Sequence, residues 1–247
     1  MKIEIIPALS DNYIYLLTEG SLATAIDPGE ATPVLSALER SDARLERVLI
    51  THNHYDHTAG CDDLKAATGC TIIGPADAGL GMLDQALEDG DQLRIGNAAV
   101  EVMATPGHTA GHISFYSEDL EALWCGDTLF VAGCGRITGS TAETLWPSIV
   151  KIGTLPDDTR IYCGHEYTIA NLKFALSLEP DNTAVAERLG EVEKILSRGE
   201  PSVPTTVALE KQTNPFIRAA SLGEAVGLPN GDPAAIFAEI RKRKDRW

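Results

Sequence analysis

The sequence predicts a mixed α/β domain over residues 1–168 and a smaller, mainly helical part over residues 169–247. Short runs of β-type composition alternate with amphipathic segments in the first part, whereas helical patterns replace strands after Glu166. With 247 residues and 44% hydrophobic residues, the chain is long enough for one large globular domain or one domain with an appendage.

The chain begins with a predicted strand meander. Turn residues at 10–12, 19–20 and 27–29 separate short runs that are rich in β-formers. These runs cover residues 3–7, 13–18 and 23–26. Thr32 and Pro33 then begin an amphipathic helix that ends near Ser41, with Thr32 as the N-cap and Pro33 at the first helical position.

Strands and helices alternate along the rest of the chain. A strand over residues 47–50 precedes a histidine-rich motif, and a helix is expected from about residue 58 to 68, where Gly69 ends it. A short helix is also expected near residues 80–88. The other predicted strands cover residues 71–73, 92–95, 99–103, 112–117, 122–125 and 160–163. The other predicted helices cover residues 142–153, 167–178, 184–198 and 233–242, with a proline-rich passage before the last.

Charge and cysteine content narrow the class of protein. The formal net charge of −16 argues against a general nucleic-acid or anionic-membrane binder, because both need a basic surface. The first residues lack the basic and apolar regions of a secretory signal, and no later run approaches the roughly 18 apolar residues of a membrane span. We therefore expect a cytoplasmic protein. Five cysteines without a CxxC pair fit reduced thiols better than a disulfide framework.

The motif Thr51-His52-Asn53-His54-Tyr55-Asp56-His57 holds three of the six histidines of the chain. Imidazole and carboxylate are ligands that zinc and similar divalent metals prefer, and His-x-His at a strand end points both rings to the same side. One metal is therefore expected on His52 and His54. Asp56 and His57 follow as the chain turns, so they face a second position nearby, which suggests a two-metal site. A single histidine is more often structural, but four candidate ligands at this spacing favour a metal site.

Three later segments place a metal-competent residue just beyond a strand and beside glycine or proline. Residues 105–112 contain His108 and His112, residues 126–130 contain Asp127, and residues 163–167 contain His165. Taken singly, each of these residues is more often structural or part of a turn. Together with the first motif, they complete two sites of at least three protein ligands each, with one carboxylate bridging.

These motifs resemble the metallo-β-lactamase superfamily and, within it, the hydroxyacylglutathione hydrolases, also known as glyoxalase II. The resemblance runs essentially from end to end. Several segments separate this family from lactamases, lactonases and nucleases of the same superfamily. They are Asp11-Asn12-Tyr13, Ala132-Gly133-Cys134-Gly135-Arg136, Cys163-Gly164-His165-Glu166-Tyr167-Thr168, Asn171-Leu172-Lys173-Phe174-Ala175, Asn214-Pro215-Phe216 and Arg241-Lys242-Arg243-Lys244-Asp245.

The resemblance implies an αββα sandwich with a smaller C-terminal helical domain that binds glutathione. It also implies two divalent metal ions, with zinc favoured and iron or manganese acceptable. Asp56 and Asp127 would hold the metal-bridging hydroxide that attacks the thioester, and His112 would lie behind the ligands. The implied ligands are His52, His54 and His108 for the first metal, Asp56, His57 and His165 for the second, and Asp127 between them.

The substrate residues implied by the resemblance are Arg136, Tyr167, Phe174, Arg241 and Lys244. Thr138 departs from the pattern, because some relatives have an aromatic residue there. Five of the twenty Lys and Arg residues lie in the last seven positions. Such a basic end is commonly just a solvated helix terminus with a favourable dipole, but anionic glutathione conjugates need a local basic cluster on so acidic a protein.

The expected function is hydrolysis of S-(2-hydroxyacyl)glutathione, such as S-D-lactoylglutathione, to glutathione and a 2-hydroxy acid, such as D-lactate. This reaction is the second step of methylglyoxal detoxification. The expected partner is this small-molecule thioester, with no nucleic acid and no membrane, and the expected protein is a monomer. The alternatives are a mononuclear-iron persulfide dioxygenase of the same superfamily and a catalytically silent binding module. A metal count of two ions, one iron or none distinguishes the three.

Overall fold

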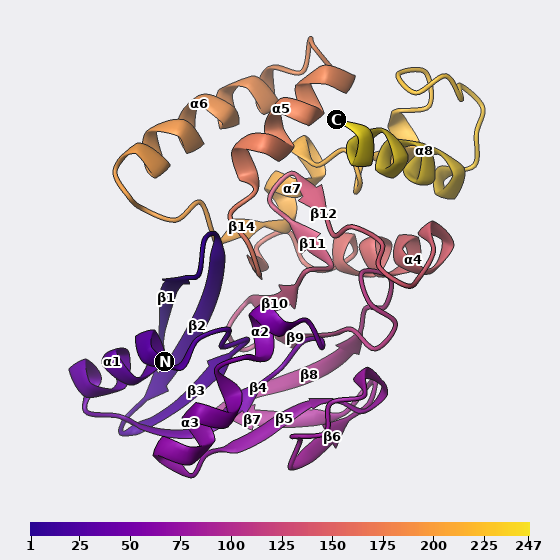
Figure 1. Ribbon diagram of the computed structural model, residues 1–247. Helices are drawn as coiled ribbons and strands as arrows, with labels where there is room; N and C mark the ends of the chain where they lie inside the picture. Colours follow the sequence, from indigo (N-terminus) through magenta and orange to yellow (C-terminus); the bar gives the residue numbers. More distant parts are fainter.

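Two six-stranded β-sheets face each other in the computed structural model, which describes all 247 residues (Figure 1). The first sheet contains, in spatial order, β1 (Lys2–Ala8), β2 (Asn12–Glu19), β3 (Leu22–Ile26), β4 (Arg44–Leu49), β5 (Thr71–Pro75) and β6 (Gln85–Leu87). The second contains β14 (Thr205–Thr206), β13 (Arg160–Cys163), β10 (Ala122–Gly126), β9 (Ile113–Ser117), β8 (Ala98–Ala104) and β7 (Gln92–Ile95). In the first sheet, β1, β2 and β3 pair antiparallel, whereas β3, β4, β5 and β6 run parallel. In the second sheet, every pair is antiparallel except β10 with β13.

Strand β2 explains how the layers are held together. Its side chains alternate between two cores, because successive residues of a strand point to opposite faces. Tyr15 and Leu17 belong to the main core cluster of 37 residues, where the Tyr15 ring lies 5.3 Å from that of Tyr162 in the opposite sheet. Ile14 and Leu16 belong to a second cluster of 16 residues beneath the helices α1 (Ala31–Ser41) and α3 (Cys61–Thr68).

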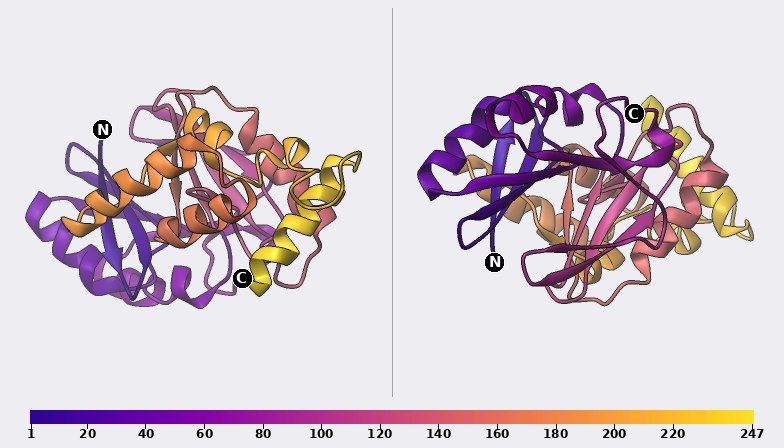
Figure 2. Two further views of the ribbon diagram at one scale, coloured as in Figure 1. Left: turned by 90° about the horizontal axis from the view of Figure 1, so that it is seen from above. Right: turned by 90° about the horizontal axis from the view of Figure 1, so that it is seen from below.

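A further helix covers the other sheet. The helix α4 (Ala142–Gly153) contributes Leu145, Ile149 and Ile152 to the main core. Together with α1 and α3 on the first sheet, this arrangement confirms the αββα sandwich, and Figure 2 shows it from two further sides.

The C-terminal part consists mainly of helices, three of which contribute to the main core. The helices are α5 (Thr168–Leu178), α6 (Thr183–Ser197), α7 (Val207–Thr213) and α8 (Pro233–Arg246), and the 3₁₀ turn η2 (Ala219–Ser221) precedes α8. The other 3₁₀ turn, η1 (Ala76–Ala78), lies in the first part of the chain. Phe174 on α5, Val207 on α7 and Phe237 on α8 belong to the main cluster, and α8 packs against α4. The helix α6 packs on α5 in a separate cluster of five residues that includes Val185 and Val192. The strand β14 adds Thr205–Thr206 to the second sheet, so the expected boundary between residues 168 and 169 stays a prediction.

Two expected helices differ from the structure. The helix predicted near residues 80–88 is wrong, because residues Gln85–Leu87 form β6, which pairs in parallel with β5. The helix predicted over residues 58–68 is not continuous. The short helix α2 (Tyr55–Thr58) ends before Gly60, and α3 begins after it. A Cβ atom at Gly60 would lie 2.6 Å from the backbone of Glu30, so the chain requires glycine where the two segments meet.

Smaller differences concern helix ends. The helix α1 begins at Ala31 after Glu30, so Thr32 is not the N-cap. The proline-rich passage contains α7. The helix α8 continues to Arg246, so Arg241 and Lys244 lie on one helix. All five cysteines are buried and free, as expected. None of the helices combines the length and the apolar character needed to cross a bilayer.

Candidate metal centre and adjoining cavity

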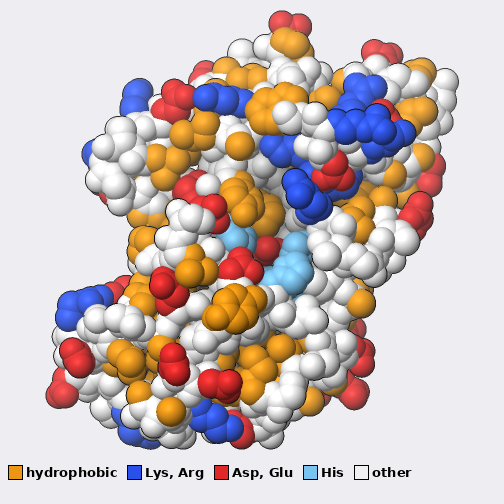
Figure 3. Space-filling view, viewed as in Figure 1, with side chains coloured by type: hydrophobic (Ala, Val, Ile, Leu, Met, Phe, Trp, Pro, Cys, Tyr) orange, Lys and Arg blue, Asp and Glu red, His pale blue; other side chains and the backbone are white.

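The histidine-rich segments meet at one edge of the sandwich, where several strands end. The first motif follows β4, His108 lies between β8 and β9, Asp127 follows β10 and His165 follows β13. Figure 3 shows histidine side chains at the floor of a hollow that separates the sandwich from the C-terminal helices. Residues far apart in the sequence are therefore placed together by the ends of neighbouring strands.

A first group of candidate ligands contains His52, His54, His108 and Asp127. One donor atom from each lies within 4.8 Å of the others. Nε2 of His108 and Nδ1 of His54 are 3.0 Å apart. Two neutral imidazoles can bring such nitrogens together only by a shared hydrogen or a shared cation.

A second group contains Asp56, His57 and His165, which again lie within 4.8 Å of one another. Nε2 of His57 is 3.2 Å from Nε2 of His165, and Oδ2 of Asp56 is 3.3 Å from the same His165 atom. Glycine is needed at position 164, next to His165, because a Cβ atom there would lie 2.3 Å from Oδ1 of Asp127.

Asp127 lies between the two groups. Its Oδ2 is 3.4 Å from Nε2 of His108 and 3.3 Å from Nε2 of His165, and its Oδ1 is 3.4 Å from Nε2 of His57. One carboxylate thus faces donors of both groups, which is the geometry of a bridging ligand.

The donor set fits divalent metal ions. Nε2 of His52 and Oδ1 of Asp127 are buried without a hydrogen-bond partner. Buried polar atoms normally have partners, and both of these atoms point into a cluster of nitrogen and oxygen donors of the type that zinc and similar metals prefer. A cation would satisfy them.

Buried polar groups behind the donors fix their orientation. Asp27 accepts hydrogen bonds from the backbone and hydroxyl of Thr51 at 2.8 and 2.7 Å and lies 3.1 Å from Nδ1 of His57. Oδ1 of Asp11 is 2.7 Å from Nδ1 of His165. Sequence reasoning missed Asp27, because Asp27-Pro28-Gly29 is an ordinary turn signal. Such outer partners typically fix the tautomer of a ligand.

His112 is buried behind the cluster and faces none of its donors directly. Its Nδ1 lies 3.1 Å from the hydroxyls of Thr105 and Thr128, and its Nε2 accepts a hydrogen bond from the backbone of Asp127 at 3.2 Å. The ring stacks on His52 with centroids 4.9 Å apart. His112 therefore supports two members of the first group.

Burial and charge set the protonation of the cluster. Burial would raise the pKa of Asp127, but His57 and His165 outweigh it and hold that pKa well below its usual range. Burial lowers the pKa of His52 well below its usual range. Burial also opposes the charged form of His57, yet Asp127 and Asp27 raise its pKa well above the usual range. Asp127 and His52 are thus in the forms that bind metals.

A cavity of about 480 Å³ adjoins the cluster and contains most of the expected substrate residues. Its lining includes His108 and Asp127 of the cluster together with Arg136, Tyr167, Arg241 and Lys244. Tyr167 stacks on His165, with centroids 4.9 Å apart. Thr138 lines the cavity as well.

The basic residues of the cavity differ in their surroundings. Arg241 is only 5% exposed, and it donates to the backbone carbonyl of Cys134 at 2.9 Å and to Asp245 at 2.8 Å. Nζ of Lys244 lies 5.1 Å from the ring centroid of Phe174. Phe174 itself is 1% exposed and lies behind Lys244, outside the cavity lining.

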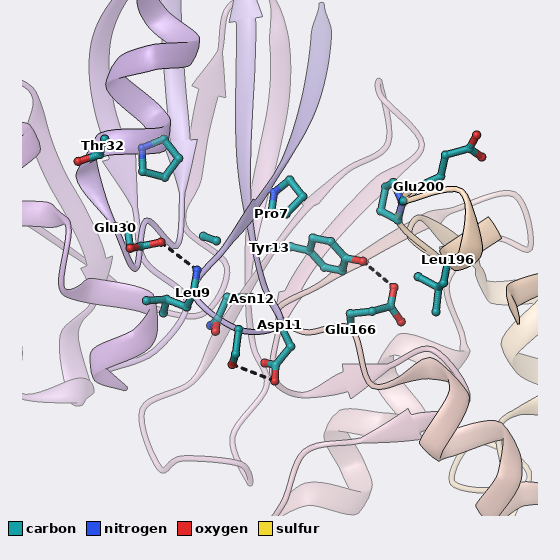
Figure 4. A pocket seen from close by; sticks show the side chains of 15 residues that line it. Pro7, Leu9, Asp11, Asn12, Tyr13, Glu30, Thr32, Glu166, Leu196 and Glu200 are labelled. Carbon is teal, nitrogen blue, oxygen red and sulfur yellow. Dashed lines mark hydrogen bonds between the residues drawn. The ribbon is translucent and has the colours of Figure 1, made fainter. Parts of the chain in front are cut away.

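A second cavity of about 580 Å³ is lined in part by the loop between β1 and β2 (Figure 4). Its lining contains the carboxylates of Asp11, Glu30, Glu166 and Glu200 and no lysine or arginine. The hydroxyl of Tyr13 donates to Glu166 at 2.5 Å across it. An anionic substrate would be repelled there, so the first cavity is the better substrate site.

The fold and the His/Asp cluster place the chain in the metallo-beta-lactamase superfamily, and the sequence model of that superfamily matches residues 9–165. Residues 166–247 match the family described as "Hydroxyacylglutathione hydrolase C-terminus". The chain belongs to the hydroxyacylglutathione hydrolase family.

Individual relatives agree with this assignment. The hydroxyacylglutathione hydrolase of Methylococcus capsulatus is 48% identical over 97% of this chain and 96% of its own length. That of Rhodospirillum rubrum is 45% identical, covering 100% of this chain and 99% of its own. Among solved structures, ETHE1 from Myxococcus xanthus is 27% identical with a TM-score of 0.68, covering 99% of this chain and 98% of its own. The BLEG-1 B3 metallo-beta-lactamase is 23% identical with a TM-score of 0.66, covering 87% of this chain and 99% of its own, and it shares the fold.

Proposed function

We propose that the protein hydrolyses the thioester of S-(2-hydroxyacyl)glutathione, such as S-D-lactoylglutathione, to glutathione and a 2-hydroxy acid. The observation that carries this proposal is one cavity whose lining includes both His108 and Asp127 of the donor cluster and the basic residues Arg241 and Lys244. A thioester carbonyl can reach the cluster while an anionic tripeptide contacts the basic residues. D-lactate is the acid expected in methylglyoxal detoxification.

The ligand assignment follows the two donor groups. His52, His54 and His108 would hold one divalent ion, Asp56, His57 and His165 the other, and Asp127 would contact both. Bound metals supply an activated water and a Lewis acid that polarises the carbonyl. Zinc is favoured, and iron or manganese also suit these ligands.

The carboxylates of Asp56 and Asp127 hold and orient the attacking water in this proposal. Asp127 remains ionised at neutral pH because its pKa is held low by the surrounding histidines. It can therefore accept a hydrogen bond from the water at either oxygen. The leaving glutathione thiolate needs little acid assistance, because thiols ionise near pH 8.5.

The cysteine in the cavity lining is not suited to act as a covalent nucleophile. Burial raises the pKa of Cys134, the cysteine in the cavity lining, to about 11, so its thiol stays protonated at neutral pH. Direct hydrolysis without an acyl-enzyme is therefore proposed.

Glutathione would be held by Arg136, Tyr167, Arg241 and Lys244, with Phe174 supporting Lys244 from behind. A protein with a net charge of −16 repels an anionic thioester at long range, so a local basic surface is needed. Figure 3 shows Lys and Arg side chains gathered on the upper rim of the hollow that contains the histidines. Arg136 is well exposed on this cavity, with 76% of its side chain accessible.

The test is a thiol-release assay with S-D-lactoylglutathione on purified protein, together with elemental analysis. We expect release of one thiol per substrate and about two metal ions per chain. One iron per chain with no thiol release would favour the mononuclear dioxygenase, and an inactive, metal-free protein would favour the silent binding module. The second donor group, Asp56 with His57 and His165, favours the hydrolase. Gel filtration tests the proposed monomer, and cell fractionation tests the proposed cytoplasmic location.

A further inference from the structure

The hairpin formed by β11 (Leu129–Phe130) and β12 (Gly133–Cys134) connects the metal cluster to the substrate cavity. It begins just after Asp127 and leads to Arg136, and both Phe130 and Cys134 line the cavity. Each strand has only two residues, and the pair forms a sheet of its own. A two-stranded ribbon of this kind is at best marginally stable in water, so other parts of the protein must hold it.

Side chains of the C-terminal helices hold the turn of the hairpin by its backbone. Asn171 donates to the carbonyl of Val131 at 3.0 Å, and Asn214 donates to that of Gly133 at 2.9 Å. The backbone N–H of Ala132 donates to Oε2 of Glu210 at 2.8 Å. Consecutive residues of the turn are thus fixed by three side chains from the C-terminal part.

Glu210 is fully buried and uses both of its oxygens. Oε2 accepts from Ala132 and from Nδ2 of Asn214 at 2.8 Å each, while Oε1 accepts from Arg188 and from the hydroxyl of Thr205 at 2.7 Å each. Arg188, on α6, is only 8% exposed. A buried carboxylate persists only when it is paired and hydrogen-bonded, so Arg188 is the partner that allows Glu210 to sit under the hairpin.

We propose that the buried Arg188–Glu210 pair is a positioning device that fixes the β11–β12 hairpin, and with it the glutathione side of the cavity. Neither residue touches the cavity, so both act through Phe130, Cys134 and Arg136. The inference rests on the proposed thioesterase function for its kinetic part only. Asp127 has a separate support in His112, so the metal cluster should keep its ions when the pair is broken.

The variant Glu210→Gln tests this role with little change in volume. Its single carbonyl oxygen cannot serve Ala132 on one side and Arg188 on the other, and its amide hydrogens would face other donors. The matched control is Glu179→Gln, in the same C-terminal part. It weakens the pair between Glu179 and Arg218, whose atoms lie 2.7 Å apart and which makes no hydrogen bond to the hairpin. Thr205→Val is a milder second variant, which removes only one hydroxyl from the network.

Three quantities are measured on each protein: backbone hydrogen exchange of residues 129–136, KM and kcat for S-D-lactoylglutathione, and metals per chain. In Glu210→Gln we expect faster exchange confined to the hairpin, a KM raised roughly tenfold, a kcat within about threefold of wild type, and the metal count unchanged. Thr205→Val should change in the same direction by less, and it carries the test if Glu210→Gln does not fold. Glu179→Gln should leave hairpin exchange and KM as in wild type.

The proposal is overturned if hairpin exchange in the folded variants equals that of wild type, or accelerates equally throughout the chain. It is also overturned if Glu179→Gln raises KM as much as Glu210→Gln does. Absence of thiol release by the wild-type protein would overturn the proposed function instead, and hydrogen exchange would still test the anchoring of the hairpin.

Discussion

The backbone N–H of Asp127 donates a hydrogen bond to Nε2 of His112 over 3.2 Å. This contact distinguishes the role of His112 from that of His108, which lies four residues earlier in the same motif. His108 directs Nε2 at the Asp127 carboxylate, 3.4 Å away, whereas His112 uses its nitrogens on a backbone N–H and on threonine hydroxyls. One histidine faces the donor cluster, and the other positions a member of it.

The two histidines should therefore respond differently to substitution. His108→Ala should lose metal and activity together, because it removes a proposed ligand. His112→Ala should keep the metals and lose activity by about 10- to 100-fold, as is typical when a residue behind a metal ligand is removed. Elemental analysis and kcat/KM of both variants check this. Metal loss in His112→Ala with metal retained in His108→Ala would reverse the assignment.

Removal of the proposed bridging carboxylate should have the largest effect. Asp127→Ala leaves the two donor groups without a shared anion, so we expect fewer than two tightly held metals and very little turnover. Asp27→Asn is a useful comparison, because it keeps the shape of a residue that orients His57 at 3.1 Å and is not itself a proposed ligand. Two metals and near-normal rates in Asp127→Ala would falsify the bridging role.

The meeting of the candidate ligands could be predicted from sequence because these residues are chemically distinctive and several of them are adjacent in the chain. The supporting residues could not be, because their roles depend on tertiary contacts. Asp27 has the pattern of a turn residue, and Glu210 lies on a short helix within a proline-rich passage. Gln85 lies in a short, weakly patterned segment that becomes strand β6 only through its pairing with Ile73. Local pattern gave no sign of these long-range partners.

Substrate affinity should depend on pH through Lys244. Burial and the neighbouring charge of Arg241 lower the pKa of Lys244 to about 8. The ammonium attracts the anionic thioester only while it is protonated, so kcat/KM should fall as the pH rises through about 8 and not near the usual lysine value. Because kcat/KM reports the free enzyme, its pH profile is the quantity to measure.

Lys244→Arg is the control for this pH effect, because arginine remains charged throughout the accessible range. The variant should lose the fall near pH 8 even if its affinity differs from wild type. An identical profile in wild type and Lys244→Arg would assign the pH dependence to another group.

Arg241→Ala and Lys244→Ala should both raise KM with kcat nearly unchanged, because contacts to the glutathione end are equal in ground and transition states. A hydrogen bond to a charged group contributes about 1.5 to 3 kcal/mol, which corresponds to roughly 10- to 100-fold in KM. Lys242→Ala is the matched control, since Lys242 lies on the same helix with 58% of its side chain exposed and outside the cavity lining.

The surroundings of the two residues predict a further difference, in stability. Arg241 is buried and donates to the carbonyl of Cys134 and to Asp245, so Arg241→Ala should also lower the free energy of unfolding, by about 1 to 3 kcal/mol. Lys244→Ala should affect mainly binding, because Lys244 packs on the rings of Phe174 and Trp247 and donates only to the carbonyl of Ala170. Denaturant unfolding of each variant measures this difference.

Salt dependence provides the last test of the basic end. Added salt should raise the wild-type KM, because it screens the attraction between Lys244 and an anionic substrate beyond about 10 Å. The Arg241→Ala, Lys244→Ala double variant should respond less, since the charges being screened are gone. A double variant with the wild-type KM at both low and high salt would reduce the basic segment to a solvated helix end. Glutathione recognition would then rest on Arg136 and Tyr167, which line the same cavity.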